Sequence, residues 1–235
     1  MANRIHPTAL IGPQVELGDN NDVGPYCVLT GKTVIGDNNV FVSHVSVGQP
    51  PQHRKFDHRL DPGAGPGIVK IGSNNVFREF VTIHQPYIQE TVVGSDCFVM
   101  AYSHISHDTI LEDHVTIANS AQIGGHSVIM RNVNIGLQTC LHQYTVIGSY
   151  TMLGMGSATS KNLIPFSKFV GSPSAKRVGI NKIGLERLGF KPEELQAIEE
   201  WCRVYLTSPE AHLDFPSLAA EVARFEAYCL ERDYK

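Results

Sequence analysis

An aliphatic or aromatic residue recurs every six positions along most of this chain. The series starts at Ile5 and Ile11, pauses over residues 49–68, changes phase over residues 84–92, and then runs unbroken from Val93 to Leu153. Glycine often follows the apolar residue, as in "IGDNNV" and "IGSNNV". A period of six fits neither an α-helix nor a β-meander. It fits short strands joined by tight corners, where glycine or asparagine takes the turn conformation and the apolar residue points inward.

Three such strands form one triangular coil of about eighteen residues, and successive coils lie about 4.8 Å apart. We therefore predict a parallel β-helix over residues 1–165. The two segments that interrupt the repeat, residues 49–68 and 84–92, are expected to be loops that leave a rigid prism. Loops on a rigid scaffold are the usual position of binding segments.

The repeat stops at about residue 165, and residues 166–235 are expected to form a basic connector and an α-helical C-terminal domain. The stretch "KPEELQAIEEWCRVYL" places Leu195, Ile198 and Tyr205 on one side of a helix, with Pro192 in its first turn. The stretch "FPSLAAEVARFEAYCLERDYK" predicts another helix, with Ser217 as its candidate N-cap. These helices would cover the open edge of the last coil or form a surface for a partner.

The composition narrows the class of protein. The formal net charge is −4, so no uniformly basic surface for nucleic acid is implied. The five cysteines are scattered and contain no C-x-x-C pair, which favours reduced thiols and a cytoplasmic location. No stretch approaches the 18 or so apolar residues of a membrane span, and the first twenty residues do not resemble a signal peptide.

Histidines are concentrated in the later coils. His107 lies two residues beyond the inward-facing Ile105, His126 lies nineteen residues further on, and His142 another sixteen. Coils of about eighteen residues would bring these three within a residue or two of vertical register on one outer face. Such a row is suited either to general base catalysis, because the imidazole pKa is near neutral, or to binding zinc.

Several motifs resemble those of the UDP-N-acetylglucosamine O-acyltransferases of lipid A biosynthesis, a hexapeptide-repeat acyltransferase family. They include "REFVTIH", "AYSHISHD", "ANSAQIGGH", "LHQYTVIG" and "VGINKIGLERLGF", and the resemblance covers nearly the whole chain. It implies a left-handed β-helix, a helical C-terminal domain, and a homotrimer with its active sites between subunits. It also implies transfer of an (R)-3-hydroxyacyl chain from acyl carrier protein to the 3-hydroxyl of UDP-N-acetylglucosamine.

The resemblance implies a role for individual residues. His107 would be the general base, Asp108 would orient it, and the backbone N–H of Gly125 would hold the developing oxyanion. No metal or cofactor would be needed, because the acyl donor is carried on the phosphopantetheine of acyl carrier protein. The substrate-binding residues would be Gln52, His53, Lys55, His104, His126, His142, Gln143, Asn181 and Arg187, the last two on the nucleotide phosphates.

Two further expectations concern the acyl donor. Met155 matches the family position that measures the acyl chain, and a methionine there predicts a medium-length 3-hydroxyacyl group. Residues 161–191 contain seven basic residues and one acid, which would steer an acidic acyl carrier protein toward the site. The basic residues are Lys161, Lys168, Lys176, Arg177, Lys182, Arg187 and Lys191.

Three departures from the family pattern leave the acceptor open. His53 stands in place of an aspartate, Pro173 in place of a histidine, and Leu188 in place of a second arginine. A different UDP-sugar, such as a 3-amino sugar that would be N-acylated, is one alternative. Another is a zinc enzyme resembling the γ-class carbonic anhydrases, which would need three histidines that converge across a subunit interface, with His84, His104 and His107 available. A third is a non-catalytic scaffold whose helices bind a partner.

Overall fold

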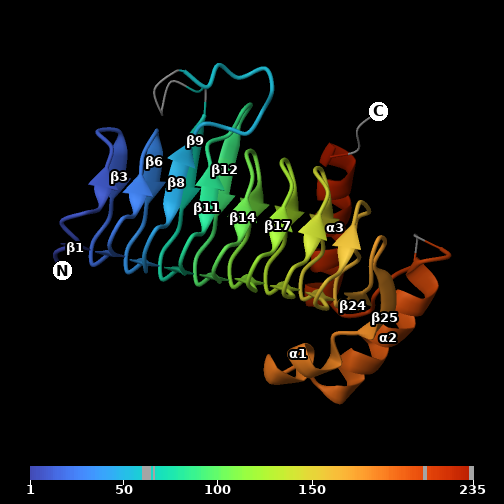
Figure 1. Ribbon diagram of the computed structural model, residues 1–235. Coiled ribbons are helices and arrows are strands. Elements are labelled where there is room, and N and C mark those ends of the chain that lie inside the picture. Colours follow the sequence, from blue (N-terminus) through green and yellow to red (C-terminus); the bar gives the residue numbers. More distant parts are fainter. Residues whose placement is uncertain (60–64, 66, 209–210, 233–235) are drawn as a thin grey trace.

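The chain winds into a prism of three parallel β-sheets that is followed by a small helical region (Figure 1). This computed structural model describes residues 1–59, 65, 67–208 and 211–232. The three sheets contain ten, eight and seven strands. In each of them the solenoid strands pair in parallel, and neighbours in a sheet are separated in the chain by one complete coil. The predicted parallel β-helix is therefore confirmed.

The strands of each sheet are as follows. The first sheet consists of β1 (Arg4–Ile5), β4 (Asp22–Val23), β7 (Val40–Phe41), β10 (Val76–Phe77), β13 (Phe98–Val99), β16 (Thr116–Ile117), β19 (Asn134–Ile135), β22 (Met152–Leu153), β24 (Ser167–Val170) and β25 (Lys176–Ile180). The second consists of β2 (Leu10–Ile11), β5 (Val28–Leu29), β8 (Ser46–Gln49), β11 (Thr82–His84), β14 (His104–Ile105), β17 (Gln122–Ile123), β20 (Cys140–Leu141) and β23 (Ala158–Thr159). The third consists of β3 (Val15–Leu17), β6 (Thr33–Ile35), β9 (Ile68–Ile71), β12 (Glu90–Val93), β15 (Ile110–Leu111), β18 (Val128–Ile129) and β21 (Val146–Ile147).

The six-residue apolar series forms the core of the prism. Ile105 pairs in register with Ile123 and Ile123 with Leu141, so each side chain stacks on its equivalent eighteen residues later. Phe41 and Phe77 stack in the same way, with ring centroids 5.0 Å apart, and both are fully buried. Because the members of this series are buried from Val23 to Leu153, burial of these rows supplies the main driving force for folding.

Both interruptions of the repeat are shorter loops than expected. Gln49 and Ile68 belong to β8 and β9, so the first loop occupies the residues between them, of which 60–64 and 66 lie outside the described residues. The second loop spans only residues 85–89, because β12 already begins at Glu90 and pairs with Ile68. The strands extend into both segments because Gln49 pairs with His84 and Ile68 pairs with Glu90.

The helical region starts later than residue 165. Strand β24 still pairs in parallel with β22, and β25 then covers it in an antiparallel pair that shields the last strand edge. The helices are α1 (Lys182–Arg187), α2 (Pro192–Tyr205) and α3 (Pro216–Arg232). Pro192 and the buried face of α2 are as predicted. Ser217 is not an N-cap, because α3 begins one residue earlier at Pro216, a residue well suited to the first helical turn.

Helix α3 returns to the prism and lies against the face that contains β21 (Figure 1). Several of its contacts there are ionic: buried Glu221 pairs with Arg131 and accepts a hydrogen bond from Ser149, while Arg224 pairs with Glu112. The helix is thereby held in one register along the coils. Within the described ranges, every helix is too short or too polar to cross a bilayer.

Candidate active site

The predicted catalytic residues lie at the corner between the second and third sheets, which we call the loop edge (residues 107–108, 125–126 and 143–144). The residues 85–89 loop leaves the prism at this corner. Asp108, His126 and Tyr144 occupy the left-handed position of three successive coils, with φ of 58°, 60° and 65°. Aspartate and histidine tolerate this conformation better than most non-glycine residues. The sequence therefore repeats the same sharp turn in each coil.

His107 and Asp108 form a direct pair. The distance from His107 Nδ1 to Asp108 Oδ2 is 2.8 Å, and both side chains are almost fully buried. An ionised carboxylate can only accept, so Nδ1 must carry the proton. The lone pair of the imidazole is then on Nε2. This tautomer is the one that a general base requires.

Asp108 is held by the loop that covers it. Its carboxylate accepts hydrogen bonds from the backbone N–H groups of Tyr87, Ile88 and Gln89 at 2.8 to 2.9 Å. Burial alone would raise the pKa of Asp108, but the hydrogen bonds from His107 and from these three N–H groups lower it to about 2. The carboxylate is therefore ionised at neutral pH, and it fixes both the imidazole and the loop.

Gly125 lies against the ring of His107. A Cβ atom added at Gly125 would be 2.9 Å from His107 Cε1 and 3.0 Å from Nε2, closer than real contacts allow. The Gly125 N–H donates to no acceptor among the described residues. The second glycine of "IGGH", Gly125, thus makes room for the imidazole of His107 and places an N–H without an internal acceptor beside it.

The predicted row of histidines is correct for two members and offset for the third. The His107 and His126 rings meet edge to face, with centroids 5.1 Å apart. The residue one coil above His126 is Tyr144, whose ring stacks on it at 4.5 Å. His142 lies two residues earlier, is exposed, and has its Nδ1 next to the Gln143 carbonyl at 3.1 Å. The coil of eighteen residues explains the offset, because His126 and His142 are only sixteen apart.

His104 lies on the adjoining strand. Its Nδ1 contacts the Thr82 hydroxyl at 2.8 Å, and its ring meets that of His84 edge to face at 5.0 Å. Burial, His84 and His107 lower the pKa of His104 to about 4. Burial also lowers the pKa of His126, against the opposing effect of Asp108. Both rings are therefore neutral at physiological pH and offer a lone pair or an N–H to a substrate.

The loop after β8 delivers one of its three predicted residues to the site. The ring of His53 stacks on Tyr87 at 3.8 Å and meets His107 edge to face at 5.9 Å. Gln52 and Lys55 are exposed on the same loop, and Gln143 is exposed at the loop edge itself. Of these three loop residues, His53 is therefore the one that contacts His107, and it is also the one that departs from the family pattern.

Three predicted residues lie elsewhere in the same chain. Asn181 donates its side-chain N–H to the Tyr150 carbonyl at 2.9 Å, and Arg187 is exposed near the end of α1. Figure 1 shows α1 on the opposite side of the prism from the loops. Met155, 75% exposed, follows β22 at the corner between the first and second sheets. One chain alone does not bring these residues to His107.

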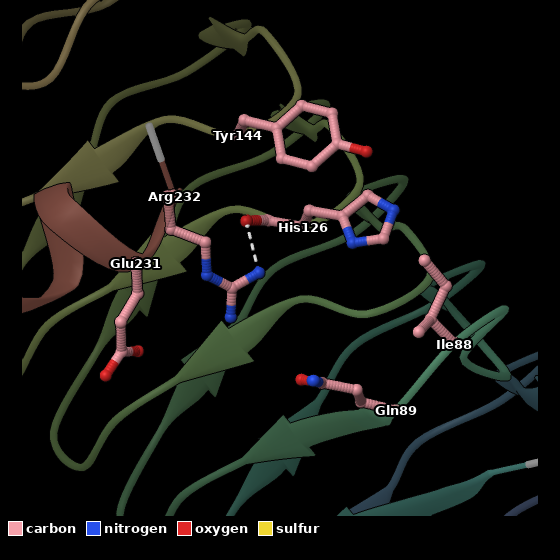
Figure 2. Close-up of a pocket in the computed structure, with 6 residues that line it drawn as sticks. All are labelled: Ile88, Gln89, His126, Tyr144, Glu231 and Arg232. Atoms are coloured by element: carbon pink, nitrogen blue, oxygen red, sulfur yellow. Dashed lines mark hydrogen bonds between the residues drawn. The ribbon is translucent and has the colours of Figure 1, made fainter. Parts of the chain in front are cut away.

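A pocket of about 360 Å³ opens beside His126 and involves residues that sequence analysis missed (Figure 2). It is lined by Ile88, Gln89, His126, Tyr144, Glu231 and Arg232. Arg232, the last described residue of α3, donates a hydrogen bond of 2.8 Å to the His126 carbonyl. Tyr144 could have been found by counting eighteen residues from His126. No sequence signal connects Arg232 to a residue 106 positions away.

A metal ion would find one group of ligands in the described part of the chain. Atoms of His107, Asp108 and His126 all lie within 4.8 Å of one another. Asp108 is already saturated by four hydrogen bonds, so this group is built as a hydrogen-bonded unit. The expected zinc ligands His84, His104 and His107 do not form such a group within these residues.

Comparisons with known proteins agree with this geometry. A family model for the bacterial transferase hexapeptide (six repeats) matches residues 90–125, and one for domain 2 of UDP-N-acetylglucosamine O-acyltransferase matches residues 163–225. The acyl-[acyl-carrier-protein]–UDP-N-acetylglucosamine O-acyltransferase of Halorhodospira halophila is 35% identical over 225 residues, which cover 87% of this chain and 83% of that protein. The corresponding enzyme of Herminiimonas arsenicoxydans is 36% identical over the same length and coverage.

Solved structures give the same result. The UDP-N-acetylglucosamine acyltransferase of Bacteroides fragilis superposes with a TM-score of 0.78 at 26% identity, over 95% of this chain and 94% of that one. The acyltransferase of Francisella novicida gives a TM-score of 0.77 at 26% identity, over 95% and 89% of the two chains. The solenoid fold is shared with these solved structures, and the relatives match most of the chain. This chain therefore belongs to the family of UDP-N-acetylglucosamine O-acyltransferases.

Proposed function

We propose that the protein transfers an (R)-3-hydroxyacyl chain from acyl carrier protein to the 3-hydroxyl of UDP-N-acetylglucosamine, the first step of lipid A biosynthesis. The observation that carries the proposal is the His107–Asp108 pair against Gly125: a base of defined tautomer, an ionised partner and an N–H without an internal acceptor. The names of the relatives supply both substrates.

The reaction follows from these groups. The sugar hydroxyl attacks the thioester carbonyl while His107 Nε2 takes its proton, and Asp108 stabilises the resulting imidazolium. The carbonyl oxygen becomes an oxyanion, which the Gly125 N–H stabilises by up to ~3 kcal/mol. The tetrahedral intermediate then expels the phosphopantetheine thiolate, which recovers the proton from His107. A thioester is already activated, so no covalent acyl-enzyme is needed.

Completion of the site would need a second copy of the chain. Met155 lies on an edge of the prism that neighbours the loop edge, and this apolar edge also exposes Tyr26, Phe80, Tyr102 and Leu137. Repeated exposed apolar residues along one edge are typical of an interface. In the homotrimer of the family, the apolar edge of one subunit would face the loop edge of the next. Met155, Asn181 and Arg187 would then come from the neighbouring subunit.

The acyl carrier protein would approach over the basic residues of 161–191. Lys161, Lys176 and Lys191 are exposed, whereas Arg177 pairs with Glu199 and Lys182 with Glu186. These three lysines form no ion pair with the described residues, so they would provide a positive surface for an acidic carrier and raise its association rate at low ionic strength.

A second acceptor is favoured by one contact. His53, which replaces an expected aspartate, stacks on Tyr87 and meets His107. An imidazole changes the hydrogen-bonding partners available to the sugar, so a UDP-sugar with a 3-amino group is the alternative acceptor, with an amide as product.

One experiment tests both candidate acceptors. The protein is incubated with 3-hydroxydecanoyl acyl carrier protein and a panel of UDP-sugars that includes the 3-hydroxy and the 3-amino form, and product masses are recorded. His107→Gln should lower the rate by about 10²- to 10⁴-fold. His114→Gln is the matched control, because His114 is an exposed histidine in the same left-handed position of another corner. Equal loss in both variants, or no loss in His107→Gln, defeats the assignment of the base.

A further inference from the structure

The end of α3 is held over the loop edge by contacts far from it. Glu221 pairs with Arg131 and with Ser149, and three residues further along the helix Arg224 pairs with Glu112. One turn beyond, the Tyr228 hydroxyl donates to Glu112 at 3.0 Å. These contacts lie on one face of the helix, because their spacing follows its turns. The position of Arg232, one turn further again, is therefore set by the docking of the whole helix.

Arg232 uses only part of its hydrogen-bonding capacity. One terminal N–H group donates to the His126 carbonyl at 2.8 Å, whereas the remaining guanidinium N–H groups have no acceptor among the described residues. The side chain is partly buried, and burial lowers the pKa of Arg232 from its ordinary value while leaving it cationic. A guanidinium in this state is preorganised to bind an anion with a forked geometry.

The pocket next to Arg232 has the polarity that such an anion needs. Figure 2 shows the guanidinium and the Gln89 side chain directed toward the space beside His126, with Glu231 directed away from it. The negative charge of Asp108 is compensated by three backbone N–H groups and His107. Ile88 supplies an apolar wall. Arg232 is thus the positive group that faces the cavity.

We propose that this pocket, with Arg232 as its charged donor and Gln89 and His126 as neutral partners, binds a phosphate group of a substrate at the catalytic corner. The proposal deepens the proposed function and rests on it for the identity of the ligand. Both substrates carry phosphate, as the diphosphate of the UDP-sugar or the phosphodiester of the phosphopantetheine arm. Either group would be held next to His126 and hence next to the His107 base.

Equilibrium binding tests the pocket without requiring turnover. Isothermal titration calorimetry is performed on the full-length protein with four ligands: UDP, uridine, 4′-phosphopantetheine and pantetheine. Arg232→Gln should weaken the phosphate-bearing ligand that uses the pocket by roughly ten- to a hundredfold, and should leave its phosphate-free counterpart unchanged. Arg232→Lys should recover part of the affinity. Arg203→Gln is the control, because Arg203 is 72% exposed on α2 and its one ion pair among the described residues is with Glu200.

Each outcome has a defined meaning. Weakening of UDP but not of phosphopantetheine assigns the pocket to the nucleotide, and the reverse assigns it to the acyl donor. Equal affinities for wild type and Arg232→Gln, or a similar loss in Arg203→Gln, overturn the proposal. Should Arg232→Gln fail to fold, Arg232→Lys with a normal melting temperature and full affinity for both phosphate ligands also overturns it. If phosphate binding depends on Arg232 but the protein shows no acyl transfer, the proposed reaction is wrong and the phosphate-binding pocket still stands.

Discussion

The imidazole of His107 packs directly on the backbone of Gly125, one coil above it. Any Cβ at residue 125 would lie 2.9 Å from His107 Cε1. The two residues therefore form one functional unit, because the position of the base depends on the absence of a side chain eighteen residues later. In the proposed reaction the same absence leaves the Gly125 N–H accessible to the thioester carbonyl oxygen, next to the base that deprotonates the sugar hydroxyl.

Replacement of Gly125 by alanine should impair catalysis more than folding. The new methyl group would displace the His107 ring by a few tenths of an ångström or more, and misplacement of this order lowers the rate by up to about 10²-fold. The comparison variant is Gly124→Ala, whose methyl would lie 2.5 Å from the Gln143 backbone nitrogen. We expect a lower melting temperature for Gly124→Ala and a lower kcat for Gly125→Ala. A reversed pattern in thermal melts and steady-state kinetics would contradict the assignment.

Asp108→Asn should reverse the tautomer of the base. An asparagine amide can donate to His107 Nδ1, which moves the imidazole proton to Nε2 and removes the lone pair. At neutral pH we expect kcat to fall by about 10³- to 10⁴-fold with the fold retained. Steady-state kinetics and a circular dichroism spectrum check this, and near-normal turnover would show that His107 does not act as the base.

Asp108 also predicts how stability depends on pH. Its pKa is lowered from the usual 3.8 to about 2 in the folded protein, so the folded state favours the carboxylate. This contribution, about 2 kcal/mol, is fully present above pH 4 and is lost as the pH falls toward 2. Denaturant unfolding between pH 2 and pH 5 should therefore show a weaker pH dependence in Asp108→Asn than in the wild type. Identical profiles would refute the lowered pKa.

Glu221→Gln should loosen α3. Glu221 is 3% exposed and compensates Arg131 and Arg224, so its neutralisation leaves two cations without their shared partner. We expect a loss of about 2 kcal/mol, less than for a fully buried pair because both arginines are partly exposed. Hydrogen exchange should accelerate in residues 216–232, whereas Glu193→Gln, at an exposed position in α2, should leave it unchanged. Unaltered protection in Glu221→Gln would show that α3 is held by other contacts.

Met155→Gly should lengthen the preferred acyl chain. The exposed methionine side chain would block the end of the acyl groove, and its removal would open room for additional methylene groups, each worth about 0.8 kcal/mol when buried. The measurement is kcat/KM for 3-hydroxyacyl carrier proteins of medium and long chain. The matched control is Leu137→Gly, one coil earlier on the same apolar edge. A wild-type preference for the long chain, or an unchanged preference in Met155→Gly, would exclude Met155 as the ruler.

The repeat made most of the fold predictable from sequence. Inward residues such as Ile105 and Ile123 recur at a fixed spacing, and a strand-corner period of six leaves few alternatives to a solenoid. The proximity of His107 and His126 followed from the same counting. The start of α3 was predicted two residues late, because an N-cap at Ser217 places the first helical residue at Leu218 instead of Pro216, and α1 was not predicted. Short helices and caps depend on local contacts that the period does not encode.

The sequence by itself determined the solenoid, its buried rows and the identity of the corner residues, because each of these depends on spacing within neighbouring coils. Only the tertiary structure decided what surrounds the base. The loop of residues 85–89 closes over Asp108, His53 reaches His107, and α3 brings Arg232 to the His126 carbonyl. These contacts join segments up to 106 residues apart. They arise from the docking of loops and a helix onto the prism, which no local periodicity specifies.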